Sequence, residues 1–562
     1  MRLAIALAVM VCGAVTGQVQ AAQGQAAGND QSRASDQAKA ADQAKTAEQI
    51  RAAEQRGRIL LVLPFDNRSG QPSLEWIREA APEILSSRFV SAGFAPMSRT
   101  DRLYALDHLG LPQGFHPSRA TALKLAETLD ADSIVVGSFL TDGSRIVAEA
   151  RLVDVPHLRM SDAVTASGEM RDLIAVFGSL AWKLTRQLDS RFSVAEETFV
   201  AEGAGLRLDA FEQYVRGITE VDQAERLRHL NQAVLESPEF GPAWMALGRE
   251  DYNGQQYEKA AAAFAKVARG DIALQGPDAL EAAFYRGLSL VFFGDYAMAE
   301  QAFGSVARVL PLAEVLNNEG VAVSRQGNDG TALFRQAVVA DPNTADFHFN
   351  LAVSLKRRGN GADALTELGQ CLKLHPNDSE AQTLDAAWTG TGAGASSSAG
   401  GEGKADPLER IARNFDAQVF RQAAQMLDQV DSSRLAALTP ERRAQMLAGQ
   451  AKEYLDRGLL LEAERLYLAA EAADGAMAEV HTGLAEVRER TGDGRAARNE
   501  ANAALQLSPS VDAYLVLARI DFAGGDLDGA NKETGEALRL DGSSRAAMEM
   551  KQEIETKQAQ KK

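Results

Sequence analysis

The chain has 562 residues, of which 45% are hydrophobic and 24% are charged, a composition typical of globular proteins, and its length allows several domains. Its net charge of −18 argues against nucleic acid as a partner, because phosphate recognition needs a surface rich in lysine and arginine. Its two cysteines are Cys12 and Cys371, and removal of an N-terminal leader would leave one, so no internal disulfide is expected.

The first 22 residues have the pattern of a secretory signal. Arg2 precedes an apolar run over residues 3–15, which is shorter than a membrane span needs, and small residues near Ala22 suit cleavage. Residues 1–22 therefore predict an exported, periplasmic protein with no membrane span after cleavage. The alternatives are an uncleaved signal that anchors the chain to the inner membrane, and a cytosolic protein that keeps its N-terminus. Residues 23–56, rich in Ala, Gln, Asp and Lys, are expected to form a partly disordered tether.

Residues 57–192 are predicted to form a mixed α/β domain. An apolar run over residues 59–65 is typical of a buried strand, and a β-branched run over residues 133–139 indicates another. An Asp-Gly turn leads into residues 145–154, which alternate between apolar and polar side chains as a hairpin strand does. A long amphipathic helix over residues 170–188 would complete the domain.

This region resembles the TolB amino-terminal domain and the related flagellar and curli accessory domains of the outer membrane (FlgO and CsgG). The resemblance is carried by five short segments, at residues 63–67, 69–70, 98–99, 131–139 and 148–154. It implies an α/β fold and a role in the cell envelope. The β-propeller that follows this domain in TolB has no counterpart here.

From residue 208 the sequence repeats with a period of about 34 residues. The clearest copy of the repeat has characteristic residues at Trp244, Leu247, Gly248, Tyr257, Ala260 and Phe264. Small residues recur where two helices would cross closely, and a proline follows most helix ends. This is the period of the tetratricopeptide repeat (TPR), a helix–turn–helix unit that stacks into a solenoid. The sequence thus resembles TPR proteins.

The expected fold is multidomain, with the mixed α/β domain followed by all-α TPR solenoid arrays. Array 1 is predicted over residues 207–388 and array 2 over residues 406–550, of which 406–437 would be degenerate helices. The Gly/Ser-rich residues 389–405 would be a flexible linker. The polar tail, residues 551–562, would extend a capping helix.

The sequence offers no catalytic constellation. Its seven histidines are scattered without i, i+4 spacing or paired cysteines, so it predicts no metal site. A nucleophile elbow and a phosphate-binding loop are both absent. We therefore expect neither an enzyme nor a cofactor-binding protein.

Two asparagines suggest a peptide-binding groove. Asn318 and Asn350 occupy equivalent places in the first helices of consecutive repeats. In TPR families that bind peptides, an asparagine at this place often bonds the ligand backbone, since an amide both donates and accepts. Four further side chains should line the same face: Phe349, Val353, Lys356 and Arg357. The alternative is that the asparagines only stabilise packing between neighbouring helices.

Capture of a C-terminal carboxylate is not expected. Carboxylate-clamp TPRs need lysine, asparagine or arginine at four positions that here hold Phe284, Leu288, Glu380 and Leu384.

Phe284, Tyr285, Phe292 and Phe293 form an aromatic cluster on one predicted helix. Aromatic side chains are usually buried. Any exposed subset would be a candidate anchor for a partner, and we take Phe284, Tyr285 and Phe292 as those candidates.

Together these features predict an exported, non-catalytic scaffold for protein–protein interaction. Its TPR groove would bind partner peptides or helices in cell-envelope or secretion assembly. The alternative is a ligand-sensing or regulatory module, with the α/β domain as sensor and the TPRs as output. A deep apolar pocket with converging polar groups in the α/β domain would favour that alternative, whereas a shallow, filled domain would favour the scaffold.

Overall fold

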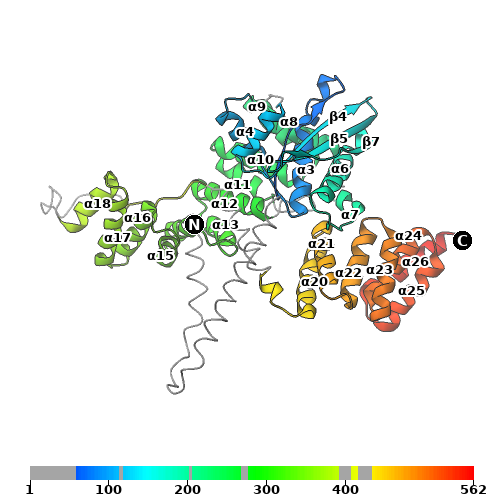
Figure 1. The fold of residues 1–562 in the computed structure, drawn as a ribbon. Helices are drawn as coiled ribbons and strands as arrows, with labels where there is room; N and C mark the ends of the chain where they lie inside the picture. Colours follow the sequence, from blue (N-terminus) through cyan, green and yellow to red (C-terminus); the bar gives the residue numbers. More distant parts are fainter. Residues whose placement is uncertain are drawn as a thin grey trace, which may run out of the picture. The chain divides into compact units, whose positions relative to one another are not determined.

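The structure is a computed structural model of the chain (Figure 1). It describes residues 58–112, 118–201, 205–267, 276–390, 407–414 and 433–561. The predicted signal and tether, and nearly all of the predicted linker, lie outside these ranges.

The described residues form two compact units. The groove unit runs from Pro238 to Asn414, and the sheet unit comprises Arg58–Ser237 and Ser433–Lys561. Within the described ranges, no helix combines the length and the apolar character needed to span a membrane.

The sheet unit contains one mixed sheet. Its strands are β1 (Ile59–Val62), β2 (Asp66–Asn67), β3 (Ala95–Pro96), β4 (Ser133–Thr141), β5 (Arg145–Asp154), β6 (Arg159–Met160) and β7 (Val164–Glu169). β1 lies between β3 and β4 and is parallel to both, and β2 also pairs in parallel with β4. β4 and β5 form the central antiparallel hairpin, and β5 pairs further with β6 and β7.

Helices cover both faces of this sheet. They are α3 (Ile77–Ser91), α4 (Arg99–His108), α5 (Arg119–Thr128) and α6 (Leu173–Leu188), with short 3-10 helices at Pro72–Leu74 and Met170–Asp172. α7 (Glu196–Ala201) packs on α6. Consecutive residues of β4, Ile134 and Val135, are both fully buried, and neighbouring strand residues point to opposite faces. Ile134 packs with α4 and α5, while α6 packs on β5 and β7 and against α3. The predicted mixed α/β fold is confirmed.

The sheet unit also holds two helices that the 34-residue period places in array 1. These are α8 (Leu208–Thr219) and α9 (Gln223–Glu236). The Tyr214 hydroxyl on α8 donates to Glu83 Oε2 on α3 at 2.8 Å, and Arg216 Nη2 donates to the Ser73 carbonyl at 3.3 Å. These bonds join the first predicted repeat to the α/β domain.

The rest of the sheet unit is a stack of antiparallel helices. They are α20 (Pro440–Asp456), α21 (Leu460–Ala473), α22 (Ala478–Arg490), α23 (Gly494–Leu507), α24 (Val511–Gly524), α25 (Leu527–Leu540) and α26 (Arg545–Lys561). α26 includes almost all of the predicted polar tail. The stack contacts the α/β domain through α21, where buried Glu464 accepts from the Ala195 amide at 3.1 Å and pairs with Arg488 at 2.6 Å.

The groove unit is a second stack of helices. They are α10 (Gly241–Asn253), α11 (Tyr257–Phe264), α12 (Gly276–Phe293), α13 (Tyr296–Ala307), α14 (Ala313–Arg325), α15 (Thr331–Ala340), α16 (Ala345–Arg357), α17 (Gly361–Leu374) and α18 (Ser379–Thr389). Three helix pairs, α10–α11, α12–α13 and α14–α15, cross at a glycine that faces a phenylalanine of the second helix. A Cβ on Gly287 would lie 2.7 Å from the Phe303 ring, so only glycine permits this crossing. The predicted all-α arrays are therefore confirmed as a fold class.

Candidate peptide-binding groove

An extended stretch of chain lies against the helices of the groove unit. We call residues Pro407–Asn414 the docked segment. The sequence predicts degenerate helices over residues 406–437. Residues 407–414 form neither helix nor strand, so that expectation is wrong there, whereas residues 433–436 are helical. Main-chain groups of the docked segment bond to side chains of α14 and α16 instead of to one another. The remaining residues, 415–432, lie outside the described ranges.

Two asparagines bond to the main chain of the docked segment. Asn350 donates from Nδ2 to the Arg410 carbonyl at 2.7 Å and accepts from the Arg410 amide at 2.7 Å. Asn318 does the same with Ala412, at 2.8 Å in both directions. Each amide therefore uses its donor and its acceptor on one residue. The two bonded residues are two positions apart, which matches the period of an extended chain.

A third asparagine holds these two in place. Asn317 Nδ2 donates to the Arg410 carbonyl at 3.0 Å and to Asn318 Oδ1 at 3.2 Å. Its Oδ1 accepts from Asn350 Nδ2 at 2.8 Å. All three asparagines are fully buried, and buried amides need such partners. The sequence reasoning missed Asn317, because adjacent helix positions are separated by about 100° and do not normally share a face.

A cationic site of the groove receives Glu409. This residue is 4% exposed. Its carboxylate accepts from Arg325 Nε at 3.1 Å and also from Arg357 Nη1 and the Ser324 hydroxyl. Arg325 Nη2 donates to the Glu409 carbonyl at 3.0 Å as well. A buried carboxylate is tolerated here because two guanidinium groups compensate its charge.

An anionic site of the groove receives the next residue, Arg410. Its guanidinium donates to Asp346 at 2.9 Å, to Asp378 at 2.5 and 3.0 Å, and to Glu380 at 2.9 Å. It also lies 3.6 Å from the centre of the Phe349 ring, a cation–π arrangement. Burial would lower the pKa of Arg410, but these hydrogen bonds raise it above its ordinary value. In turn, the bond to Arg410 lowers the pKa of Asp378.

The side chains of Ile411, Ala412 and Arg413 contact the groove through apolar and cation–π interactions. Ile411 is partly buried against the cluster of α12, α13 and α14, and Ala412 packs against a cluster of α14, α15 and α16. The Arg413 guanidinium lies 5.0 Å from the Phe292 ring centre. Leu408 is 58% exposed. Polar and ionic contacts therefore hold the segment more than burial of large apolar side chains does.

The six predicted groove residues divide into two sets. Asn318, Asn350, Phe349 and Arg357 contact the docked segment, as described above. Val353 is buried in the core that α16, α17 and α18 share, and the Lys356 ammonium lies 5.1 Å from the Trp388 ring centre. These last two side chains support the wall of the groove from within the repeat.

The three predicted aromatic anchors differ in their surroundings. Phe284 is fully buried and makes an edge-to-face contact with Phe303, with ring centres 5.7 Å apart. It is a core residue, so its prediction as an exposed anchor is corrected. Tyr285 is partly buried against the same core cluster. Phe292 contacts the docked segment through Arg413.

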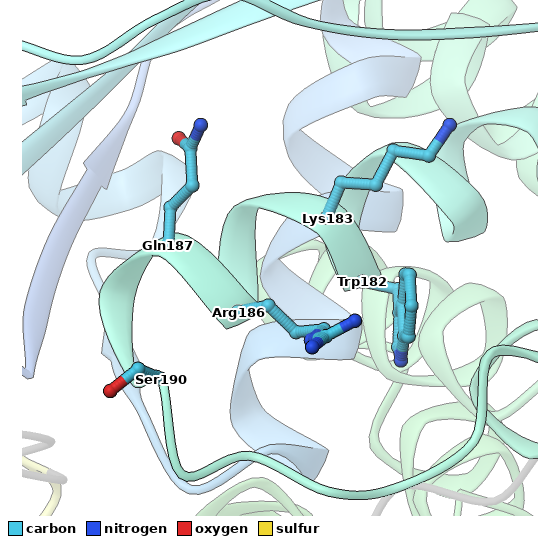
Figure 2. Close-up of a pocket in the computed structure, with 5 residues that line it drawn as sticks. All are labelled: Trp182, Lys183, Arg186, Gln187 and Ser190. Carbon is cyan, nitrogen blue, oxygen red and sulfur yellow. The ribbon is translucent and has the colours of Figure 1, made fainter.

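The α/β domain has a depression of about 260 Å³ on α6 (Figure 2). Its lining residues come from α6 and the turn that follows: Trp182, Lys183, Arg186, Gln187 and Ser190. Trp182, Lys183 and Gln187 donate to main-chain carbonyls of the same domain, at 2.9, 2.7 and 3.4 Å. The Arg186 guanidinium lies 5.0 Å from the Trp182 ring centre. Three of the five lining side chains thus bond to main-chain groups of their own domain.

No metal-binding cluster of three or more His, Cys, Asp or Glu side chains occurs among residues that the structure describes. Cys371 is buried, and desolvation raises the pKa of its thiol to about 11. A thiol with such a pKa stays protonated at neutral pH and is a poor nucleophile.

Comparison with solved structures gives several proteins that each match part of this chain. YrrB, described as a TPR protein with an unusual peptide-binding site, is 15% identical, with 37% of this chain and 98% of that chain covered and a TM-score of 0.27. MamA from Desulfovibrio magneticus RS-1 is 19% identical over 31% of this chain and 99% of that chain, with a TM-score of 0.27. The LpoB C-terminal domain from Escherichia coli is 21% identical over 20% of this chain and 82% of that chain, with a TM-score of 0.18.

No curated protein matches the sequence. The resemblance of residues 57–192 to the TolB amino-terminal domain stays a prediction. Residues 324–379, which include α15, α16 and α17, match the tetratricopeptide repeat family model. This match includes Asn350 of the groove but neither Asn317 nor Asn318.

Proposed function

We propose that this chain is a non-catalytic scaffold for protein–protein interaction, and that the groove of the first array binds partner peptides in an extended conformation. The observation that carries the proposal is the pair of buried asparagines, Asn318 and Asn350, each bonded in both directions to a main-chain residue of the docked segment. Main-chain groups are common to all peptides, so this part of the contact does not depend on sequence.

The asparagines are preorganised for this task. Asn317 bonds to both of the others, so their amides are held in place by the protein itself. A ligand then loses less free energy in ordering the site, which is the general advantage of preorganisation. The mechanism is recognition of an extended backbone by fixed amides, without any chemical step.

The test uses the full chain with residues 407–413 replaced by seven Gly and Ser residues, which we call the emptied chain. A fluorescent peptide of residues 405–415 is the probe, and anisotropy gives its dissociation constant. We expect the emptied chain to bind this peptide. The double substitution Asn318→Ala with Asn350→Ala should weaken that binding at least about 30-fold, since about four hydrogen bonds worth ~0.5–1.5 kcal/mol each are lost.

The matched control is Asn343→Ala, which changes an exposed asparagine in the turn between α15 and α16. It should leave binding unchanged. Melting temperatures of both variants show whether the array stays folded. If the folded double variant binds the probe as well as the control does, the peptide-groove function is refuted.

The location of the protein is a separate part of the proposal. The signal-like residues 1–22 support export to the periplasm, and the resemblance of residues 57–192 to the TolB amino-terminal domain supports a role in the cell envelope or in secretion assembly. Sequencing the mature N-terminus tests export. A start near Ala22 is expected, and a start at Met1 would contradict cleavage and export.

A further inference from the structure

The docked segment makes contacts that depend on its sequence as well as on its backbone. Glu409 enters the cationic site of Arg325 and Arg357. Arg410, the next residue, enters the anionic site of Asp346, Asp378 and Glu380. The two sites have opposite charge and receive consecutive residues, so the groove distinguishes an acidic residue followed by arginine from the reverse order.

The strength of this discrimination follows from burial. The Glu409 side chain is 1% exposed, and an arginine at its place would bring a buried guanidinium against the two guanidinium groups of Arg325 and Arg357. Like charges placed against one another at an interface cost several kcal/mol. Arginine is also suited to the second site, because its planar fork can bond two carboxylates while its face covers a ring such as Phe349.

The way in which the segment is held permits exchange. Leu408 is largely exposed, and Ile411 and Ala412 are only partly buried. No large apolar side chain of the segment is fully buried in the groove, so its departure would not remove part of the core. Another chain with the same charged pair could make the same contacts.

Covalent linkage gives the docked segment an advantage over any other ligand. It follows α18 after residues 391–406, a stretch rich in Gly, Ser and Ala. A covalent connection of this length holds a ligand near its site at an effective concentration of the order of millimolar. For an intrinsic dissociation constant of about 10 µM, a competing peptide of equal affinity would then bind roughly 100-fold more weakly than to an empty groove.

We propose that residues 407–413 are an in-cis ligand of the groove, and that the partner is an extended segment of another protein in which an acidic residue is followed directly by arginine and then by an aliphatic and a small residue. The proposal rests on the peptide-binding function given above and names the ligand class of that groove. The partner binds by displacing the docked segment, which makes the groove selective and closed to weak ligands.

The experiment compares the wild-type chain with the emptied chain, using two labelled peptides. The native peptide has the sequence of residues 405–415, and the swapped peptide has the residues at positions 409 and 410 exchanged. A third peptide with serine at position 408 is the matched control, because Leu408 is exposed. We expect the emptied chain to bind the native and control peptides about equally, and to bind the swapped peptide at least about 10-fold more weakly. The wild-type chain should bind the native peptide roughly 100-fold more weakly than the emptied chain does.

A double-mutant cycle assigns the readout to one site. Arg357→Ala in the emptied chain should weaken binding of the native peptide at least about 10-fold. The same substitution should weaken binding of a peptide with alanine at position 409 much less, since the partner charge is then absent. The melting temperature of Arg357→Ala shows that the array is folded.

The outcomes separate the two proposals. Equal binding of native and swapped peptides to the emptied chain would overturn the charge readout and leave the peptide groove standing. Equal binding of the native peptide by the wild-type and emptied chains would overturn the in-cis ligand. A wild-type dimer in sedimentation that is absent from the emptied chain would also overturn it, because the segment would then occupy the groove of a second copy. Failure of every peptide to bind the emptied chain would refute the proposed function itself.

Discussion

Replacing Asn350 by alanine should weaken the docking of the docked segment in the groove. Asn350 makes two hydrogen bonds of 2.7 Å with the main chain of Arg410, while Asn317 still bonds to the Arg410 carbonyl at 3.0 Å. At a net ~1 kcal/mol for each lost bond, docking weakens by about 2 kcal/mol, which is a factor of roughly 30 in the open population.

Hydrogen exchange measures that population directly. The Arg410 and Ala412 amides donate to Asn350 and Asn318, so they exchange mainly when the segment opens. Mass spectrometry of a proteolytic fragment spanning residues 407–414 in the full chain should show exchange of these amides about 30-fold faster in Asn350→Ala. Asn343→Ala, the exposed control, should leave the rate unchanged. The reasoning is refuted if the two variants exchange alike, or if the wild-type amides already exchange at the rate of an unstructured peptide.

Three further predictions concern the framework that carries the groove and the sheet. Gly287→Ala should lower the free energy of unfolding by ~1–3 kcal/mol because its Cβ would meet the Phe303 ring. Gly369→Ala, whose Cβ would meet no atom within 4 Å, should instead raise the free energy of unfolding by up to ~1 kcal/mol. Urea unfolding followed by circular dichroism measures both variants, and equal midpoints would contradict the close crossing. Desolvation raises the pKa of Glu83 above its ordinary value of 4.5, so the folded state holds a proton that the unfolded state releases; stability should fall as the pH rises from about 4.5 through the raised pKa, and Glu83→Gln should remove that slope from the pH dependence of the melting temperature. Glu464→Ala should lower the free energy of unfolding of the sheet unit by ~3–5 kcal/mol, since it leaves the largely buried Arg488 without its carboxylate partner. If calorimetry gives a change below ~1 kcal/mol, this ion pair contributes little to stability.

The repeat architecture was readable from the sequence because it depends on local and periodic features. Gly248, Gly287 and Gly320 each face a phenylalanine of the following helix, and the period places these pairs without knowledge of the fold. The asparagines at positions 318 and 350 were identified in the same way, from equivalent places in consecutive repeats. Such inferences need only the geometry of one repeat and its neighbour.

The docked segment could not be predicted in this way. Residues 407–414 lie about 60 to 94 residues from the asparagines that bond to them, and nothing in their own composition indicates an extended conformation. The apolar residues Leu408 and Ile411 have a spacing that suits a helix, but tertiary contacts override it. Phe284 shows that local features can also be ambiguous, because an aromatic residue on a repeat helix has the same local sequence signature whether it faces the core or the surface.

The two kinds of contact in the groove have different consequences for a scaffold. Bonds from Asn318 and Asn350 to the main chain would hold any extended peptide, so by themselves they would give affinity without selectivity. The adjacent sites of opposite charge supply the selectivity, because a ligand with the wrong order of charges loses both ion pairs and gains two repulsions. The docked segment then sets a threshold, since a peptide that uses the asparagines alone cannot compete with a tethered segment that uses both kinds of contact. A groove that combines general and specific contacts therefore benefits from its own internal ligand, which excludes weak peptides and yields only to a partner that matches the charged pair.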